Sequence, residues 1–309
     1  MRIEYHADDY GLFPSLTTSM NEQIKCKEIN GISLMPNGLY NIRSENDCLN
    51  MASEQIQYCV HLDLFEGQCC SDAVEIDFLA DKYGYLTSSF GSLLLYSFLP
   101  RSSEKRAKII SQLKTELHAQ IEKCVEIYPG FKRSLRIDSH AHYHVIPIVF
   151  EALTELLDES GYNIEYIRMP KDEIKYYTGI YIPLINLIKA FVLNTLIKYD
   201  IHRLKATHNT NILNICMASM ENRSFFGVLL SGRMAYSSVK LLIERAERSG
   251  KGEIELLFHP GDKLVFDEIS SLTDKNDRVF WSNKNRNMEF RTLERFIKRK
   301  STTETINRK

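Results

Sequence analysis

The sequence has no Cys-x-x-Cys pair and almost no net charge. Its seven cysteines are scattered, so a zinc ribbon and a thioredoxin-like motif are both unsupported. The adjacent Cys69 and Cys70 are expected to remain thiols in a reducing compartment. Lys and Arg total 39 against 40 Asp and Glu, which gives a formal net charge of −1. This balance argues against a general electrostatic attraction to nucleic acid.

The sequence also lacks a long apolar run. The longest candidate, Ile182 to Leu196, is interrupted by Pro183, Asn186, Lys189 and Asn194. It is too short and too polar to span a bilayer. The chain opens directly on a strand pattern, without a charged and then apolar leader segment. We therefore expect a cytoplasmic protein that does not bind membranes.

The composition is that of an ordinary globular protein, with 44% apolar and 26% charged residues among 309. This length allows one large domain or two smaller ones. No internal repeat or low-complexity segment is evident. We expect a single domain over residues 1–300, followed by a polar, basic tail over 301–309. Such a tail is expected to fray, or alternatively to contact an acidic partner.

Strand and helix patterns alternate along the chain. Strands are predicted at 2–7, 31–35, 57–62, 134–138, 163–168 and 253–258. Helices are predicted from Ser103 to Tyr128, from Pro147 to Glu159 and from Ser237 to Ser249. Ser103 is suited to cap the first of these, and Pro129-Gly130 to stop it. The alternation indicates an α/β protein with a mostly parallel sheet covered by helices. The pattern alone fits a barrel or an open doubly wound sheet.

One segment gathers histidines behind an acid: Asp138-Ser139-His140-Ala141-His142-Tyr143-His144. In an extended chain, alternate side chains share a face, so we expect all three imidazoles on one side. Neutral imidazole is a common metal ligand, and this spacing favours an ion or a titrating centre. The alternative is a polar surface strand.

Three further segments place an acid or a histidine near the end of a predicted strand. They are Ala7-Asp8-Asp9-Tyr10-Gly11, the run around His61, and His259 before Pro260-Gly261. Each alone also fits a structural role, as an exposed turn, a core histidine or a loop histidine. The carboxyl ends of parallel strands form the site in barrels and in open sheets alike. We therefore expect these side chains and His140 to share one pocket.

Together and in this order, these segments resemble the YdjC-like carbohydrate deacetylases, the family that includes chito-oligosaccharide deacetylase. The matching pieces are His6-Ala7-Asp8-Asp9-Tyr10-Gly11-Leu12, His61-Leu62-Asp63-Leu64-Phe65-Glu66-Gly67, the histidine segment from Asp138 to His144, and Phe258-His259-Pro260-Gly261. Weaker matches are Met35-Pro36-Asn37-Gly38, Ile167-Arg168-Met169-Pro170 and Phe225-Phe226-Gly227. The resemblance implies an irregular, TIM-like (β/α) barrel.

The chain departs from the family pattern in places. His6 stands where the family often has Asn, and Ala141 and Tyr143 replace other residues between the histidines. The stretch from Ile174 to Lys205 shows no family signature. These departures leave the implied metal set intact and bear on which sugar is bound.

The resemblance implies that Asp9, His61 and His140 bind one divalent metal ion. Zinc or magnesium is expected: histidine ligands favour zinc, nickel or cobalt, but mixed carboxylate-imidazole sites accept several ions. By the same carry-over Asp8 is the general base and His259 the general acid, and these two roles could be exchanged.

Other residues have less defined roles. Arg168 and His144 are expected to contact the substrate, although Arg168 fits a salt bridge near a strand end equally well. His142 and His144 also suit pocket walls or groups that orient the ligating imidazoles, as does Asp138. His6 either faces the pocket or packs within its strand.

The expected function is hydrolysis of the N-acetyl group of an amino sugar or a short N-acetylated oligosaccharide. The alternatives are a metal-dependent hydrolase of another bond, such as a phosphoester, and a carbohydrate-binding protein without turnover. The expected partner is the sugar substrate, with neither nucleic acid nor membrane. A homodimer is the default expectation for a soluble enzyme.

Overall fold

A parallel β-sheet organises the chain. The computed structural model describes residues 1–40, 42, 56–207, 209–261, 266–272 and 274–306. In these residues the strands are β1 (Arg2–Tyr10), β2 (Gly31–Leu34), β3 (Gln57–Leu62), β4 (Leu135–Ser139), β5 (Ile164–Ile167), β6 (Arg223–Phe226) and β7 (Glu253–Phe258). Their order is β5-β4-β3-β2-β1-β7-β6, and every neighbouring pair is parallel.

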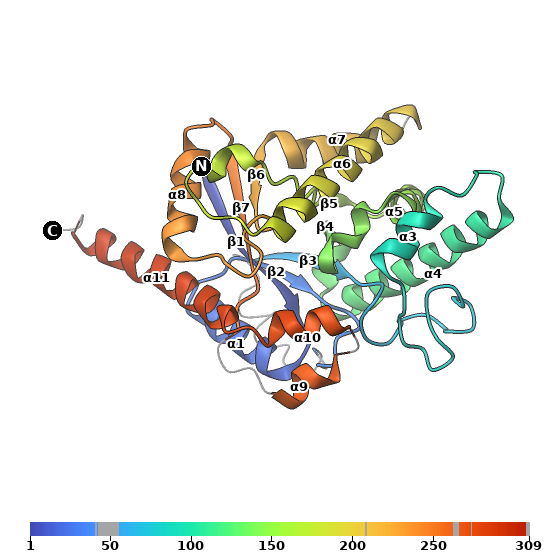
Figure 1. Cartoon of the computed structure of the whole chain (residues 1–309), viewed down its shortest axis with the longest axis horizontal. Coiled ribbons are helices and arrows are strands. Elements are labelled where there is room, and N and C mark those ends of the chain that lie inside the picture. Colours follow the sequence, from blue (N-terminus) through green and yellow to red (C-terminus); the bar gives the residue numbers. More distant parts are fainter. Residues whose placement is uncertain (41, 43–55, 208, 262–265, 273, 307–309) are drawn as a thin grey trace.

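The sheet curls into a half-barrel with helices around its outside (Figure 1). Beyond β5, Asp172 forms an isolated parallel bridge with Phe225 of β6, which brings the two edges of the sheet together at one point. Parallel strands need long crossover connections, and these are supplied by helices that cover the outer face. The expectation of an irregular (β/α) barrel is thus confirmed.

The helices have the following bounds. They are α1 (Pro14–Lys25), α3 (Phe90–Tyr96), α4 (Glu104–Ile127), α5 (Pro147–Ser160), α6 (Leu184–Ala206), α7 (Thr210–Glu221), α8 (Tyr236–Glu247), α9 (Phe266–Ser271), α10 (Lys275–Trp281) and α11 (Asn285–Ile306). Short 3-10 helices are η2 (Pro129–Lys132), η3 (His140–Val145) and η4 (Ile174–Tyr177). The predictions for α4, α5 and α8 are confirmed, with ends shifted by one or two residues.

The ends of these helices follow from local chemistry. Ser103 accepts a hydrogen bond from the Arg106 N–H and so caps α4 as predicted. Gly161 ends α5 with φ of 70°, a left-handed conformation that costs glycine little. Helix α11 continues to Ile306, into the segment expected to be a polar tail, and residues 307–309 lie outside the described residues.

Sequence patterns missed β6, α6 and α7. Strand β6 has the sequence Arg-Ser-Phe-Phe, in which two polar residues precede two aromatic residues, so polar and apolar side chains do not alternate. Helix α6 buries Leu193 and Ile197 on one side but exposes Ile188 and Phe191 on the other, so no single apolar stripe marks it. None of the helices within the described residues combines the length and apolarity needed to cross a bilayer.

The interior of the half-barrel is charged beneath the strand ends. Glu4 of β1 lies 3.1 Å from Arg136 of β4 and 3.0 Å from Arg223 of β6. Arg223 also lies 3.0 Å from Glu255 of β7. Burial alone would raise the pKa of Glu4, but Arg136, followed by His6 and Arg223, lowers it below its ordinary value. These paired charges link β1, β4, β6 and β7 across the interior of the half-barrel, below the polar residues at the strand ends.

Candidate active site

The acids and histidines predicted to share a pocket come from neighbouring strand ends. Asp8 and Asp9 end β1, and His61 of β3 pairs in register with Asp138 of β4. His140 follows β4 directly, and His259 follows β7, whose Phe258 pairs with Ala7 of β1. The curl of the sheet turns these residues toward one another. The structure therefore brings the predicted set together.

Asp9 lies at the centre of the set. Its Oδ1 is 3.0 Å from His61 Nε2 and 2.7 Å from His140 Nδ1. The candidate ligand atoms of the three residues all lie within 4.8 Å of one another, and all three residues are buried. Asp9 has φ of 66°, an uncommon left-handed conformation for a residue with a side chain. Backbone strain of this kind clusters at functional sites.

The ring nitrogens that point away from Asp9 each meet another carboxylate. His61 Nδ1 lies 2.7 Å from Asp138 Oδ1, and His140 Nε2 lies 2.7 Å from Asp277 Oδ2 on α10. Such a carboxylate fixes the tautomer of a ligating histidine and leaves its inner nitrogen free to bind a metal. Asp277 was not predicted, because nothing in the sequence around α10 marks it.

These residues fit a divalent metal ion. Two nitrogen donors and one carboxylate form a set that leaves coordination positions open. Among the described residues, the buried Asp9 Oδ2 has no hydrogen-bond partner. Burial alone would raise the pKa of Asp9, but His140 and His61 hold it well below its usual range. The carboxylate is therefore charged and has one acceptor atom to spare.

The histidine segment is not extended, and the expectation that its three imidazoles share one side is wrong. Strand pairing ends at Ser139, and Ala141 (φ 48°) and His142 (φ 61°) then adopt left-handed conformations in η3. The Ser139 hydroxyl accepts the His144 N–H, 2.9 Å away, and so stabilises the turn. Only His140 faces Asp9, while the His142 ring lies 6.0 Å from that of Phe225.

His144 and Arg168 lie beneath the site, and neither side chain is accessible to a substrate. His144 is fully buried between the Ser139 hydroxyl (2.6 Å) and the Arg168 carbonyl oxygen (2.6 Å). Arg168 is also fully buried. Its Nη1 lies 2.9 Å from Asp8 Oδ2 and 2.7 Å from Asp138 Oδ2, and its Nε is 2.7 Å from Glu255. The expected substrate contact is therefore replaced by a buried ion-pair network.

Asp8 is held from two directions. Arg168 pairs with both of its oxygens, and Ser33 Oγ lies 3.0 Å from Oδ1. Burial raises the pKa of Asp8 and Arg168 opposes that rise. His6 packs against Ser33 (2.7 Å) and Glu4 (2.7 Å) with no exposed surface. Its Nε2 also lies 3.6 Å from Asp8 Oδ1, so His6 is both packed within its strand and adjacent to Asp8.

His259 stands at the rim of the site. Its Nε2 lies 4.0 Å from Asp9 Oδ2, and its side chain is 15% exposed. The rings of Phe280 and Trp281 meet it edge-on at 5.1 and 6.3 Å. Burial lowers the pKa of His259 to about 3, so its imidazole is neutral at pH 7. On the opposite side, Phe65 stacks on His140 with ring centroids 4.9 Å apart. Aromatic rings therefore flank the metal set.

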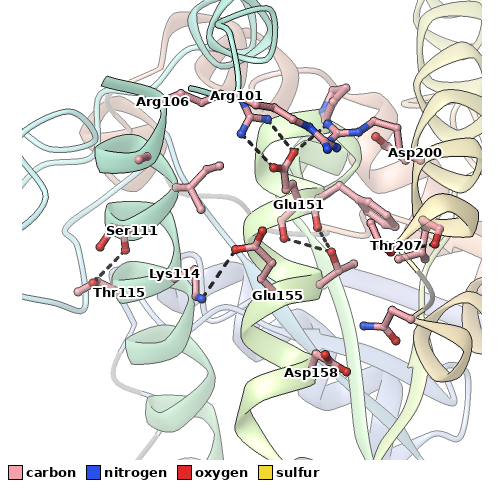
Figure 2. Close-up of a pocket in the computed structure, with 18 residues that line it drawn as sticks. Arg101, Arg106, Ser111, Lys114, Thr115, Glu151, Glu155, Asp158, Asp200 and Thr207 are labelled. Atoms are coloured by element: carbon pink, nitrogen blue, oxygen red, sulfur yellow. Dashed lines mark hydrogen bonds and ion pairs between the residues drawn. The ribbon is translucent and has the colours of Figure 1, made fainter. Parts of the chain in front are cut away.

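A separate hollow of about 830 Å³ lies outside the barrel between α4, α5 and α6 (Figure 2). Its charged side chains pair largely with each other: Arg106 makes two hydrogen bonds to Glu151, and Arg203 lies 2.8 Å from the same carboxylate. Asp200 lies in its wall. The predicted site residues do not line this hollow, so it is not part of the candidate active site.

Comparison with known proteins extends the resemblance. The family profile described as YdjC-like protein matches residues 2–297. A carbohydrate deacetylase of Clostridium beijerinckii is 27% identical over 177 residues, which make up 56% of this chain and 63% of that relative. A carbohydrate deacetylase of Xenopus laevis is 25% identical over 267 residues, which make up 84% of this chain and 81% of that relative.

A solved structure from Enterococcus faecalis V583, described provisionally as a cellobiose-phosphate cleavage protein, has a TM-score of 0.58 to this chain. The likeness covers 94% of both chains at 12% identity, and at that identity it shows the fold alone. The profile, in contrast, spans nearly the whole sequence and includes every strand end described above. The chain belongs to the YdjC-like protein family.

Proposed function

We propose that this chain is a metal-dependent hydrolase that removes the N-acetyl group from an amino sugar or a short N-acetylated oligosaccharide. The main support is the convergence of Asp9, His61 and His140, with their candidate ligand atoms within 4.8 Å, beside the buried Asp8. Two relatives named carbohydrate deacetylase support the same class of substrate.

Asp9, His61 and His140 would hold one divalent ion, zinc or magnesium. When bound, such an ion lowers the pKa of water and polarises an acetamide carbonyl. Asp138 and Asp277 orient the two imidazoles from behind, each at 2.7 Å. Although burial opposes the shift, the surrounding carboxylates raise the pKa of His61 to about 10 and that of His140 well above its usual value. Metal binding would therefore displace a proton from the inner nitrogen of each ring.

Asp8 acts as the general base and takes a proton from the attacking water. Arg168 holds its carboxylate in place through both oxygens, at 3.0 and 2.9 Å. A base works best when its pKa approaches the working pH, and burial shifts the pKa of Asp8 in that direction. Arg168 is a positioning residue in this scheme, and His144 supports the turn that presents His140.

His259 acts on the leaving group, the amide nitrogen of the sugar, whereas Asp8 acts on the attacking water. An amide nitrogen leaves poorly unless it is protonated, so a donor is needed there. His259 is partly exposed at the rim, where a sugar can reach it. Its imidazole is neutral at rest, so it first donates its N–H as a hydrogen bond. It then passes to the sugar amine the proton that Asp8 has taken from the water, so that Asp8 returns to its carboxylate form.

The test is acetate release from N-acetylglucosamine oligomers and nucleotide-linked N-acetyl sugars, with and without a chelator. Release that stops with chelator and returns when zinc or magnesium is added back is the expected result. Phosphate release from phosphorylated sugars would instead assign the site to phosphoester hydrolysis. Sugar binding without any turnover would make the chain a carbohydrate-binding protein.

A further inference from the structure

The hollow between α4, α5 and α6 is lined by two buried residues that each have a polar atom without a partner (Figure 2). Asp200 of α6 is 2% exposed, and within the described residues its Oδ2 has no hydrogen-bond partner. Arg106 of α4 is 4% exposed, and its Nε likewise has none in this part of the chain. Buried polar groups are nearly always paired, so each exception calls for an explanation. A ligand bound in the hollow would supply both missing partners.

Most of the cations in the walls are already neutralised by the protein. Arg106 makes two hydrogen bonds to Glu151, and Arg203 lies 2.8 Å from the same carboxylate. Lys114 lies 2.7 Å from Glu159. A carboxylate or phosphate ligand would therefore have to compete with these acids for its counter-charge.

The charges that stay uncommitted in the walls are mainly acidic. Among the residues that the structure describes, Asp158 and Asp200 form no ion pair, and Glu155 reaches Lys114 only at 3.8 Å. Arg101 is the one wall cation without an ion pair in the same described part, and it is exposed. This balance favours a ligand with a positively charged group.

Asp200 is able to respond to such a group. Burial raises the pKa of its carboxyl to about 9, so the carboxyl is neutral at pH 7. Arg203 of α6 opposes this rise, Glu151 of α5 adds to it, Cys216 of α7 lies near enough to interact with Asp200, and Arg106 of α4 lines the same hollow. An adjacent ammonium group favours the charged carboxylate, and the displaced proton passes to the solvent.

We propose that this hollow binds a small amine that also carries hydroxyl groups, such as an amino sugar. The ammonium group pairs with Asp200, and a hydroxyl oxygen accepts the Arg106 Nε–H. The volume of about 830 Å³ lies within the range of about 300–1,000 Å³ that is typical of small-molecule sites. Ile110, Phe150 and Leu204 add apolar surface to the walls, which suits the carbon-bound face of a sugar ring.

The cost of Asp200 to the fold fits a role in binding. A buried carboxyl without a partner destabilises a protein, and residues of this kind are expected where function requires them. An amino sugar is also the product of the proposed deacetylation. A role of the hollow in sensing that product rests on the proposed function, whereas binding of the amine does not.

The test is isothermal titration calorimetry of the full chain with glucosamine at pH 7, in two buffers that differ in ionisation enthalpy. The expected Kd is about 1 mM or tighter, with release of roughly one proton per bound amine. Asp200→Asn should weaken binding about 10- to 100-fold and abolish the proton release. Asp267→Asn, at an exposed acid on α9, is the matched control and should bind as the wild type does.

Two further ligands separate the parts of the proposal. Glucose has the ring and hydroxyl groups without the amine, and putrescine has amines without hydroxyl groups. Either of them binding as tightly as glucosamine would overturn the proposal. So would glucosamine binding that Asp200→Asn retains, or no glucosamine binding by the wild type up to about 20 mM.

Circular dichroism checks that Asp200→Asn is folded, and the proton release by the wild type is a readout that does not depend on any variant. None of these measurements involves acetate release. Failure of the deacetylase assay and failure of amine binding are therefore distinguishable results.

Discussion

Asp277 lies 2.7 Å from Nε2 of His140, although the two residues are 137 positions apart in the chain. Helix α10, which carries Asp277, is anchored around the site: the Asp274 N–H donates to Glu66 (2.8 Å), and Trp281 meets Phe13 edge-on at 5.4 Å. Helix α10 follows β7 in the chain, yet its Asp277 holds the imidazole of His140, one of the three candidate metal ligands.

We expect Asp277→Ala to lower the affinity for zinc about 10- to 100-fold, because the tautomer and orientation of His140 are no longer fixed. Competition with a chelating dye measures this affinity without any need for turnover. Asp267→Ala removes an exposed acid from the preceding helix and serves as the matched control. Wild-type affinity in Asp277→Ala would contradict the positioning role.

Asp8→Asn should abolish turnover while the protein keeps its metal. Loss of a general base costs about 10²- to 10⁴-fold in rate, and Asp9, His61 and His140 are untouched by the change. Acetate release and metal content per chain are measured on the same sample. Asp158→Asn, at an exposed acid on α5, is the control. Normal activity in Asp8→Asn would rule out its role as base.

Arg168→Met should destabilise the fold by about 3–5 kcal/mol at pH 7, because it leaves Asp8, Asp138 and Glu255 buried without their shared cation. Arg168 lowers the pKa of Asp138 against the effect of burial. In the variant nothing opposes burial, which raises the pKa of the three carboxyls, so at acidic pH they take up protons and no longer carry buried, unpaired charges.

The destabilisation by Arg168→Met should therefore shrink at acidic pH. Urea unfolding at pH 7 and pH 4 measures both values. Arg168→Lys keeps the charge without the planar fork and should cost less at pH 7. A penalty of equal size at both pH values would show that packing rather than charge dominates.

For Asp200 we expect the stability of the protein to depend on pH in the opposite direction. Within the part of the chain that the structure describes, its buried Oδ2 has no hydrogen-bond partner, and burial raises the pKa of this carboxyl to about 9. Between the unfolded value near 4 and about 9, the folded state keeps a proton that the unfolded state has lost. Stability therefore falls as the pH rises through this window.

Asp200→Asn removes this ionisation and should stabilise the protein by on the order of 2–4 kcal/mol at pH 7, and by little at pH 4. Urea unfolding of both proteins across pH 4 to 9 tests it. Asp158→Asn is again a suitable control, since this exposed acid lines the same hollow. A stability difference that does not grow with pH would contradict the prediction.

The strand ends of the candidate site can be predicted from sequence, because each joins a buried apolar run to a polar residue. Strands β3 and β7 are predicted with their observed bounds, and His61 and His259 lie at or just beyond their ends. The grouping of Asp9 with His61 and His140 was inferred from the resemblance, and the curl of the sheet supplies the physical reason for it.

Other features depend on tertiary contacts that leave no local trace. The turn at Ala141 and His142 arises because β4 loses its neighbours after Ser139, although the alternating histidines suit a strand. Asp277 has no motif around it, since its role comes from the docking of α10. Arg168 was expected to contact the substrate or to form a salt bridge near a strand end, and only the curled sheet shows that three carboxylates surround it.

Arg168 connects the protonation of Asp8 with the proposed binding of a cation beside His61. Its Nη1 touches both Asp8 and Asp138, and Asp138 in turn holds His61. A cation that arrives beside His61 favours loss of a proton from Asp8, and by thermodynamic reciprocity a proton on Asp8 weakens the hold on that cation by the same factor. In the proposed mechanism, acidity and metal supply are therefore linked variables, and each would set the range over which the other permits activity.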